Sequence, residues 1–331
     1  MTPQSATQIG RTVSPWLILL QITSCGSAPL HDSTTPAGNS VGTPPSSSAQ
    51  VLHVGASNID VRITGDPFPA SQARLMNWVA TGARAVSNFY GKFPVKWVLI
   101  QISAEGDGDE IHGTEYDGHL IRMRLGPNVS ADKLADDWTM THEMLHLAFP
   151  NMGQKHLWMN EGLSVYLEPV ARVRIGIVSE KRYWRELKEG IENGQPEDGD
   201  QGLDGTHTWG RTYWGGTIFW FLADLQIRQL TDGRRSVDDA VRTILDAGGD
   251  GSVQWPMARV LKMGDDATGT HVLSDLYAEL ALKPTRVDFD AWWQKLGVKF
   301  GENDEVRFDD SAPLAWLRRS ITAAKPAPHR G

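Results

Sequence analysis

The sequence predicts an α+β fold, in which a small mixed sheet lobe precedes a helical C-terminal lobe. Residues 51–126 contain short segments rich in apolar and β-branched residues, a composition typical of strands. From residue 130 onward, longer segments carry apolar residues at the spacing of amphipathic helices. With 40% hydrophobic residues among 331, the chain can build a sizeable core, as one large domain or two modest ones.

The N-terminal segment resembles a bacterial lipoprotein signal peptide. Arg11 is the only charged side chain before Cys25, the single cysteine, and an apolar run covers residues 13–22. This run is too short to cross a bilayer, which takes about 20 residues. The letters Ile-Thr-Ser-Cys at 22–25 resemble a lipobox, which implies cleavage before Cys25 and a lipid attached to it. An ordinary signal peptide or a disordered leader is the alternative.

Composition divides the chain into a leader, a tether and a folded region. Residues 26–50 are rich in Gly, Ser, Thr and Pro, which is typical of a flexible tether. The predicted organisation is a signal peptide at 1–24, a disordered tether at 25–50, a folded domain at 51–324 with lobes at 51–150 and 151–324, and a tail at 325–331. We therefore expect a cell-envelope protein, lipid-anchored to a bacterial membrane and facing the periplasm or the exterior.

The sheet lobe is predicted to combine strands with one helix. Ser71 opens a helical pattern that Gly91 and Pro94 close. Residues 120–125 alternate apolar and charged side chains, as a strand exposed on one face does. The predicted elements are strands at 51–54 and 59–64, a helix at 71–90, a strand at 95–103, an acidic glycine-rich loop at 105–118 and a strand at 119–126.

The helical lobe follows from Ser130, whose side chain can cap a helix. Pro150 is expected to stop that helix, and Pro169 to end or kink the next. The predicted helices run from 130 to 149, from 157 to 169, and over 181–191, 211–230, 236–247, 270–282, 289–296 and 312–323, with a glycine-rich loop at 193–208.

The first of these helices carries the pattern H-E-x-x-H, at His142, Glu143 and His146. Residues i and i+4 of a helix share one face, so both imidazoles can bind one metal ion. Glu143 lies about 100° round the helix, beside such an ion. The alternative is a helix with two histidines that have other partners. The apolar flanks favour the metal, because buried histidines and a buried glutamate need partners.

A second carboxylate completes the expected ligand set. Glu161 follows His146 after 14 intervening residues, at the start of the next helix. Two histidines and one glutamate leave a fourth position open on a tetrahedral Zn²⁺, which is the pattern of a catalytic site with one zinc ion.

These motifs resemble the gluzincin metallopeptidases, the clan of thermolysin and aminopeptidase N. The resemblance rests on H-E-M-L-H at 142–146 and W-M-N-E-G-L-S-V-Y-L-E at 158–168. It implies a thermolysin-like zincin domain whose active-site helix lies between the two lobes. It further implies that His142, His146 and Glu161 bind zinc and that Glu143 is the general base.

The resemblance extends to Tyr213, which would stabilise the oxyanion, in a segment similar to the Y-x-K-G-A helix of aminopeptidases. Three departures stand out. Gly215 replaces the lysine of that pattern, the G-A-M-E-N motif is absent, and Val165 stands where thermolysin relatives have an aspartate that orients a histidine.

The resemblance also indicates where a substrate would lie. In the gluzincins the strand before the zinc helix is the sheet edge that pairs with substrate, which by position is 119–125, with His119 and Ile121 as contacts. Glu115 could anchor a substrate amine, or be a solvated loop carboxylate. Glu168 matches the family pattern and either supports a zinc ligand or pairs with Arg172.

The function predicted from these residues is a zinc-dependent peptidase with Glu143 as general base. Its expected partners are a peptide or protein substrate and, through Cys25, a membrane. The net charge of −8 argues against a nucleic-acid partner. Two alternatives remain, namely a non-catalytic lipid-anchored binding protein with this fold and a zinc hydrolase of a non-peptide amide. Substrate identity, endo- or exo-cleavage and oligomeric state stay open.

Overall fold

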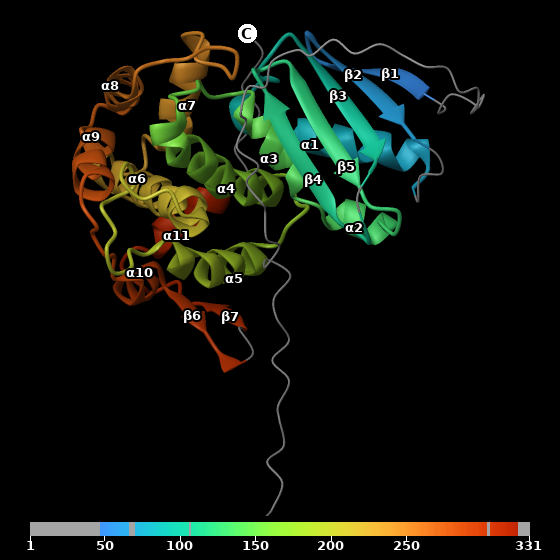
Figure 1. The fold of residues 1–331 in the computed structure, drawn as a ribbon. Coiled ribbons are helices and arrows are strands. Elements are labelled where there is room, and N and C mark those ends of the chain that lie inside the picture. Colours follow the sequence, from blue (N-terminus) through green and yellow to red (C-terminus); the bar gives the residue numbers. More distant parts are fainter. Residues whose placement is uncertain (1–46, 66–69, 106, 303–304, 324–331) are drawn as a thin grey trace, which may run out of the picture. The chain divides into compact units, whose positions relative to one another are not determined.

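A five-stranded mixed sheet forms the N-terminal part of the fold (Figure 1). The computed structural model describes residues 47–65, 70–105, 107–302 and 305–323. The strands are β1 (Ser47–Val54), β2 (Ser57–Thr64), β3 (Trp97–Ala104), β4 (Ile111–Tyr116) and β5 (Leu120–Leu125). Their order is β1-β2-β3-β5-β4, with β2, β3 and β5 parallel and the two outer strands antiparallel to their neighbours.

The edge of this sheet differs from the prediction. The segment 105–118, predicted as a loop, contains β4, and β4 is the edge strand next to the histidine-bearing helix. The strand predicted at 119–126 is β5, which lies inside the sheet between β3 and β4. The prediction that residues 119–125 form the edge is therefore wrong. The hairpin pairing of β4 with β5 outweighed the weak strand propensity of Gly113 and Glu115.

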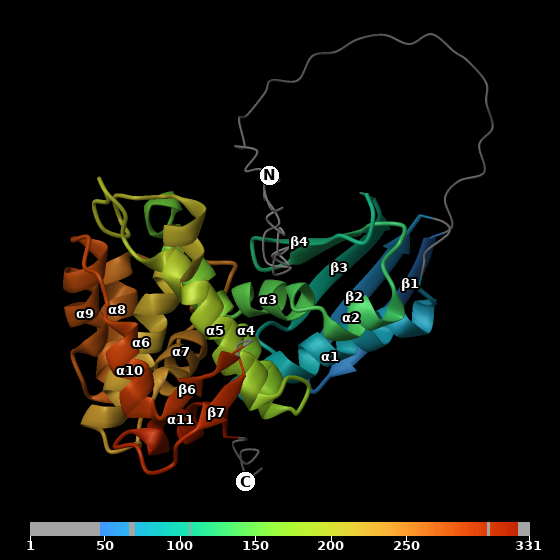
Figure 2. The same ribbon diagram turned by 90° about the horizontal axis from the view of Figure 1, so that it is seen from below.

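Helix α1 (Gln72–Tyr90) connects β2 to β3 and lies against one face of the sheet (Figures 1 and 2). Its buried residues and the alternate residues of the strands belong to one hydrophobic core. Strand β2 shows the pattern, since Ile59, Val61 and Ile63 are buried while the residues between them face outward. This alternation is what a sheet covered on one face requires.

The helix predicted from Ser130 is two helices, α2 (Ala131–Asp136) and α3 (Thr139–His146). Ser130 caps α2 by accepting a hydrogen bond from the backbone of Lys133. The backbone then becomes extended at Asp137, with ψ at 137°. The carboxylate of Asp137 accepts hydrogen bonds from the backbone N–H of Met140 and the indole of Trp78. This aspartate therefore starts α3 and attaches it to α1.

The rest of the described chain is mainly helical. The elements are η1 (Gln154–His156), α4 (Leu157–Arg174), α5 (Glu180–Ile191), η2 (Glu192–Gly194), η3 (Gly210–Gly215), α6 (Gly216–Leu230), α7 (Val237–Asp246), α8 (Met257–Thr268), α9 (Val272–Leu276), η4 (Tyr277–Ala281), α10 (Phe289–Leu296), β6 (Val298–Phe300), β7 (Val306–Phe308) and α11 (Ala315–Thr322). Helix α8 and the β6–β7 hairpin were not predicted. Pro169 lies inside α4 and does not end it.

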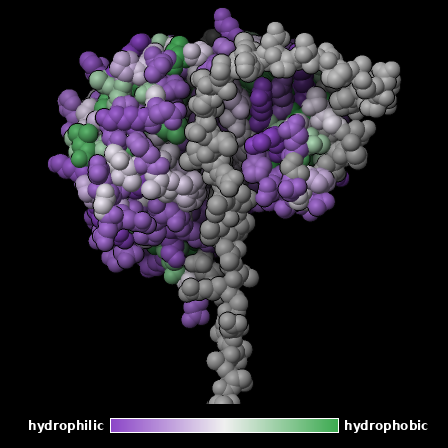
Figure 3. Space-filling model, viewed as in Figure 1, coloured by the Kyte–Doolittle hydropathy of each residue, from purple (hydrophilic) through white to green (hydrophobic). Residues whose placement is uncertain are grey.

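Helix α3 lies between the sheet and the helical part. It contacts β4 on one side and α4 on the other, and α1 packs against both α3 and α4 (Figure 2). In the view of Figure 3, the helical part is mostly hydrophilic on its surface, with hydrophobic residues in small separate patches. Because α3 contacts both β4 and α4, the H-E-x-x-H segment lies where the sheet and the helical part of the chain meet.

Several predictions for the chain ends lie outside the described residues, namely the signal peptide at 1–24, Cys25 and the tail at 325–331. The predicted tether at 25–50 overlaps the structure only at its end, where β1 begins at Ser47. Among the described residues, no helix is both long and apolar enough to span a bilayer.

Candidate active site

Three side chains from α3 and α4 converge at the junction. The Nε2 atoms of His142 and His146 lie 3.2 Å apart. The Oε2 atom of Glu161 lies 3.2 Å from the first and 3.5 Å from the second. Tetrahedral zinc ligands at about 2.0–2.1 Å from the ion lie roughly 3.3 Å from one another. The three atoms thus have the spacing of zinc ligands, and one Zn²⁺ fits this group.

The charges of the group also fit a cation. Burial opposes a charge on His146, but the Glu161 carboxylate raises the pKa of this imidazole to about 9. Burial likewise opposes ionisation of Glu161, but His146 and His142 hold its pKa well below the ordinary value. Burial lowers the pKa of His142. Without an ion, a proton on His146 balances the buried carboxylate, and a metal ion can take over that role.

One orienting residue was not predicted. Ser164 is buried on α4, one turn after Glu161, and its Oγ lies 3.3 Å from Nδ1 of His146. It holds the ring with Nε2 turned toward the other two ligands. Thermolysin relatives have an aspartate at the position of Val165. In this chain the contact to the His146 ring comes from Ser164 instead. The sequence signal was the i, i+3 spacing of Ser164 from Glu161.

Two glycines bring α4 close to α6. A Cβ atom on Gly162 would overlap the backbone of Gly216, and a Cβ on Gly216 would overlap the carbonyl of Trp158. Only glycine allows two helices to approach this closely. Because Gly162 follows Glu161 and Gly216 is three residues after Tyr213, the crossing sets the carboxylate beside the tyrosine.

Tyr213 lies on η3, a single turn of π-helix that leads into α6. Its hydroxyl lies near the carboxylate of Glu161, and its ring is stacked on that of His142 at 6.5 Å between centroids. Burial, followed by the charges of Glu161 and Glu143, raises the pKa of this phenol well above its ordinary value. The hydroxyl therefore keeps its proton and remains a donor near neutral pH. Isolated π-turns are frequent at functional sites.

Glu143 lies on the side of α3 that faces the edge strand β4. Its carboxylate lies near the backbone of Glu115, and burial raises its pKa to about 7. A Cβ atom on Gly113 would come within 2.5 Å of Cγ and 2.9 Å of Oε1 of Glu143. Gly113, which the sequence reading missed, therefore leaves room for the carboxylate under the strand. A carboxylate with a pKa near 7 can both accept and return a proton.

The structure separates the three residues predicted to contact substrate. Glu115 lies on β4, within electrostatic range of Glu143 and His146, and one of its oxygens accepts a hydrogen bond from the backbone of Gly118. His119 is exposed at the turn between β4 and β5. Ile121 is completely buried in the core on β5, so its prediction as a substrate contact is wrong. The error has the same cause as the wrong edge strand.

Glu168 pairs with Arg172 at 2.8 Å, and both side chains are buried. Arg172 also donates to the carbonyl of Asp136 at 2.8 Å. This pair therefore connects α4 to the end of α2. Of the two predicted roles, the structure places Glu168 in the ion pair.

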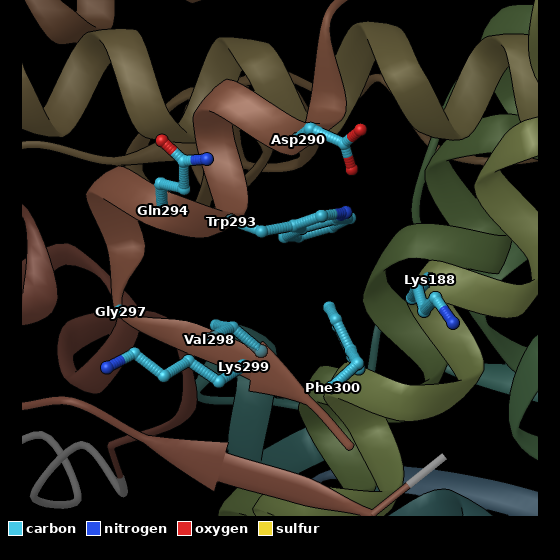
Figure 4. Close-up of a pocket in the computed structure, with 8 residues that line it drawn as sticks. All are labelled: Lys188, Asp290, Trp293, Gln294, Gly297, Val298, Lys299 and Phe300. Carbon is cyan, nitrogen blue, oxygen red and sulfur yellow. The ribbon is translucent and has the colours of Figure 1, made fainter. Parts of the chain in front are cut away.

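A separate hollow of about 590 Å³ lies between α5, α10 and β6 (Figure 4). In Figure 4 the ring of Phe300 points toward Trp293, whereas the ammonium groups of Lys188 and Lys299 point away from the space between these rings. None of the predicted site residues lines this hollow.

Comparison with known proteins establishes the fold. No family model matches the sequence, and no curated protein matches it. An aminopeptidase N family protein from Idiomarina loihiensis matches 81% of this chain with 14% identity and a TM-score of 0.59, over 53% of its own length. The M1 zinc metallopeptidase from Deinococcus radiodurans matches 74% with 12% identity and a TM-score of 0.50, again over 53% of its length.

A mutant of the Deinococcus enzyme, solved with a Tyr-Ser-Ala substrate, matches 74% of this chain with 10% identity and a TM-score of 0.51. The chain spans about half the length of these solved structures. At such identities the likeness concerns the fold. The described chain therefore shares the mixed α/β fold of these solved zinc metallopeptidases, which agrees with the resemblance of its motifs.

Proposed function

We propose that this protein is a zinc-dependent peptidase. The observation that carries the proposal is the set of three candidate ligand atoms 3.2–3.5 Å apart. Glu143 lies next to this set on α3, the helix that carries both histidines. His142, His146 and Glu161 would hold the ion. In this proposal the two parts of the chain form the walls of a thermolysin-like cleft with α3 on its floor. The packing of α3 between β4 and α4 supports this arrangement.

The residues of the chain have distinct chemical roles in this proposal. Zinc, when bound, supplies a Lewis acid that polarises the scissile carbonyl and acidifies water. Glu143 accepts the proton of the attacking water and passes it to the leaving amine. Tyr213 donates a hydrogen bond to the oxyanion that develops on the carbonyl oxygen. Ser164 holds His146 in its ligating orientation.

The edge strand favours cleavage at the amino end of a peptide. A substrate can pair with β4 through main-chain hydrogen bonds. Glu115 then presents a carboxylate to the substrate's amine, close to Glu143. The strand ends at Tyr116, and in the turn that follows a Cβ atom on Gly118 would come within 2.5 Å of the backbone of Ser252. The segment around Ser252 therefore closes this end of the site, and we propose an aminopeptidase.

The test compares peptides with free and acetylated amino termini, with and without a zinc chelator. We expect the free peptides to be cleaved, the acetylated ones to resist, and the chelator to abolish cleavage. Glu115→Gln should reduce the preference for the free amine by at least about tenfold, because a charge-assisted contact is lost. The matched control is Glu110→Gln, an exposed carboxylate paired with His112 just before β4.

The outcomes separate the alternatives. Equal cleavage of free and acetylated peptides would indicate an endopeptidase. Binding of peptides without any cleavage would indicate a non-catalytic binding protein. Chelator-sensitive hydrolysis confined to non-peptide amides would indicate the third candidate.

Zinc binding is expected to depend on pH through His146. With a pKa of about 9, this imidazole is protonated at neutral pH and must lose that proton to bind a metal. The apparent zinc affinity should therefore rise by about tenfold per pH unit from pH 7 to 9 and level off above. Titration against a chromophoric chelator and proton release in weak buffer measure this. An affinity that is constant between pH 7 and 9 would contradict it.

We also propose that the protein is anchored to a bacterial membrane through a lipid on Cys25, on the envelope side. The support is the lipobox-like sequence at 22–25 and the Ser/Thr/Pro-rich segment that separates it from β1. The mass of the mature N-terminal peptide tests this proposal. An unmodified terminus at another residue would contradict it.

A further inference from the structure

Trp209 is an exposed indole at the candidate active site. It immediately precedes η3 and is 39% exposed, which is unusual for so large an apolar side chain. Its ring stacks on that of Tyr213, with 6.1 Å between centroids and 27° between planes. Tyr213 is in turn stacked on His142. The three rings thus form a near-parallel row that leads from a zinc ligand to the surface.

The position of Trp209 is fixed by its surroundings. A Cβ atom on Gly210 would overlap the carbonyl of Asn193, so the backbone next to the indole is packed against η2. Arg211 is buried, forms an ion pair with Asp200 at 2.7 Å and donates to the carbonyl of Gly194. The exposure of the indole therefore belongs to a rigid part of the site, where a preformed apolar contact costs little entropy.

We infer that Trp209 is a specificity-determining residue, forming the wall of a subsite for a large apolar or aromatic side chain next to the scissile bond. The inference rests on the proposed peptidase function. In this proposal the scissile carbonyl of a peptide accepts a hydrogen bond from Tyr213. The peptide side chains next to that carbonyl then lie about the width of one aromatic ring from the Tyr213 hydroxyl. The indole ring lies 6.1 Å from that of Tyr213 and is 39% exposed, so it can offer an apolar surface to such a side chain. Small and charged side chains would gain less from this wall.

The test measures peptide binding separately from cleavage. The zinc-loaded Glu143→Gln protein, with and without Trp209→Ala, is titrated with Phe-Ala-Ala, Ala-Phe-Ala and Ala-Ala-Ala. We expect one phenylalanine peptide to bind more tightly than Ala-Ala-Ala and Trp209→Ala to reduce that ratio by about tenfold. Trp209→Phe should retain part of it. The control is Trp97→Ala, which removes a comparably exposed indole on β3, 45% exposed and bonded to Asp60.

If Trp209 only supported the ring of Tyr213 and did not contact the substrate, the result would differ. In that case Trp209→Ala would weaken the binding of all three peptides equally and leave the ratio of their affinities unchanged. This outcome would overturn the inference. The kcat/KM ratios of the proteins that retain Glu143 provide the second readout. If phenylalanine peptides bind through Trp209 and are never cleaved, the proposed peptidase function fails, and Trp209 forms the wall of a peptide-binding site without hydrolysis. Absence of binding by every peptide would overturn both.

Discussion

Glu143→Gln is expected to lower peptide hydrolysis by about 10²–10⁴-fold, the usual contribution of a general base, while zinc remains bound. Glutamine keeps the shape of the side chain and one acceptor oxygen near the backbone of Glu115. His142, His146 and Glu161 are untouched. Only the acceptor for the proton of the attacking water is lost. Turnover and zinc content per chain, measured on the same preparation, check this result.

Glu161→Ala provides the contrast. This change removes a carboxylate that lies 3.2 Å from His142 and 3.5 Å from His146. Zinc affinity should fall, and the stability of the protein should fall with it because two buried imidazoles lose their partner. If Glu143→Gln were free of metal while Glu161→Ala retained zinc, the roles of the two glutamates would be reversed.

Tyr213→Phe is expected to lower kcat by about 10²–10³-fold with little change in KM. The phenol is held protonated by burial and by two carboxylates, so it can donate a hydrogen bond to the oxyanion. A donor that acts mainly on the charge developing in the transition state affects kcat more than substrate binding. Steady-state kinetics on a peptide with a free amino terminus measure both constants.

Zinc content must accompany these kinetics, because the hydroxyl of Tyr213 also lies near the carboxylate of Glu161, a candidate zinc ligand. The matched control is Tyr116→Phe, which removes an exposed hydroxyl on β4. Turnover equal to that of the wild type in Tyr213→Phe would remove this residue from the mechanism.

Local spacing explains why the candidate metal ligands were predicted. His142 and His146 are brought together by one turn of helix, so their proximity follows from the sequence once the helix is recognised. Glu161 required a second helix, and the resemblance to a known motif supplied that step. The structure places all three in one group because α3 and α4 pack directly against each other.

The features that were missed depend on pairing and packing in the folded chain rather than on residue spacing within one helix. Strand β4 contains Gly113 and Glu115, residues with weak strand propensity, and its pairing with β5 is visible only in the folded chain. The break at Asp137 likewise depends on Trp78, which lies 59 positions earlier. Trp209 gave no signal of its own, because an exposed tryptophan has no motif, and Ser164 offered only its i, i+3 spacing from Glu161.

The contact between Gly162 and Gly216 gives a way to search for remote relatives. Both positions lie next to the chemistry, one directly after Glu161 and the other three residues after Tyr213, and neither tolerates a Cβ atom. A chain with H-E-x-x-H and a following glutamate arises easily by chance, whereas the two glycines add a condition set by backbone geometry. Sequences that satisfy both can be selected even where no family model matches, and a substitution at either glycine marks a chain whose tyrosine has moved away from the metal ligands.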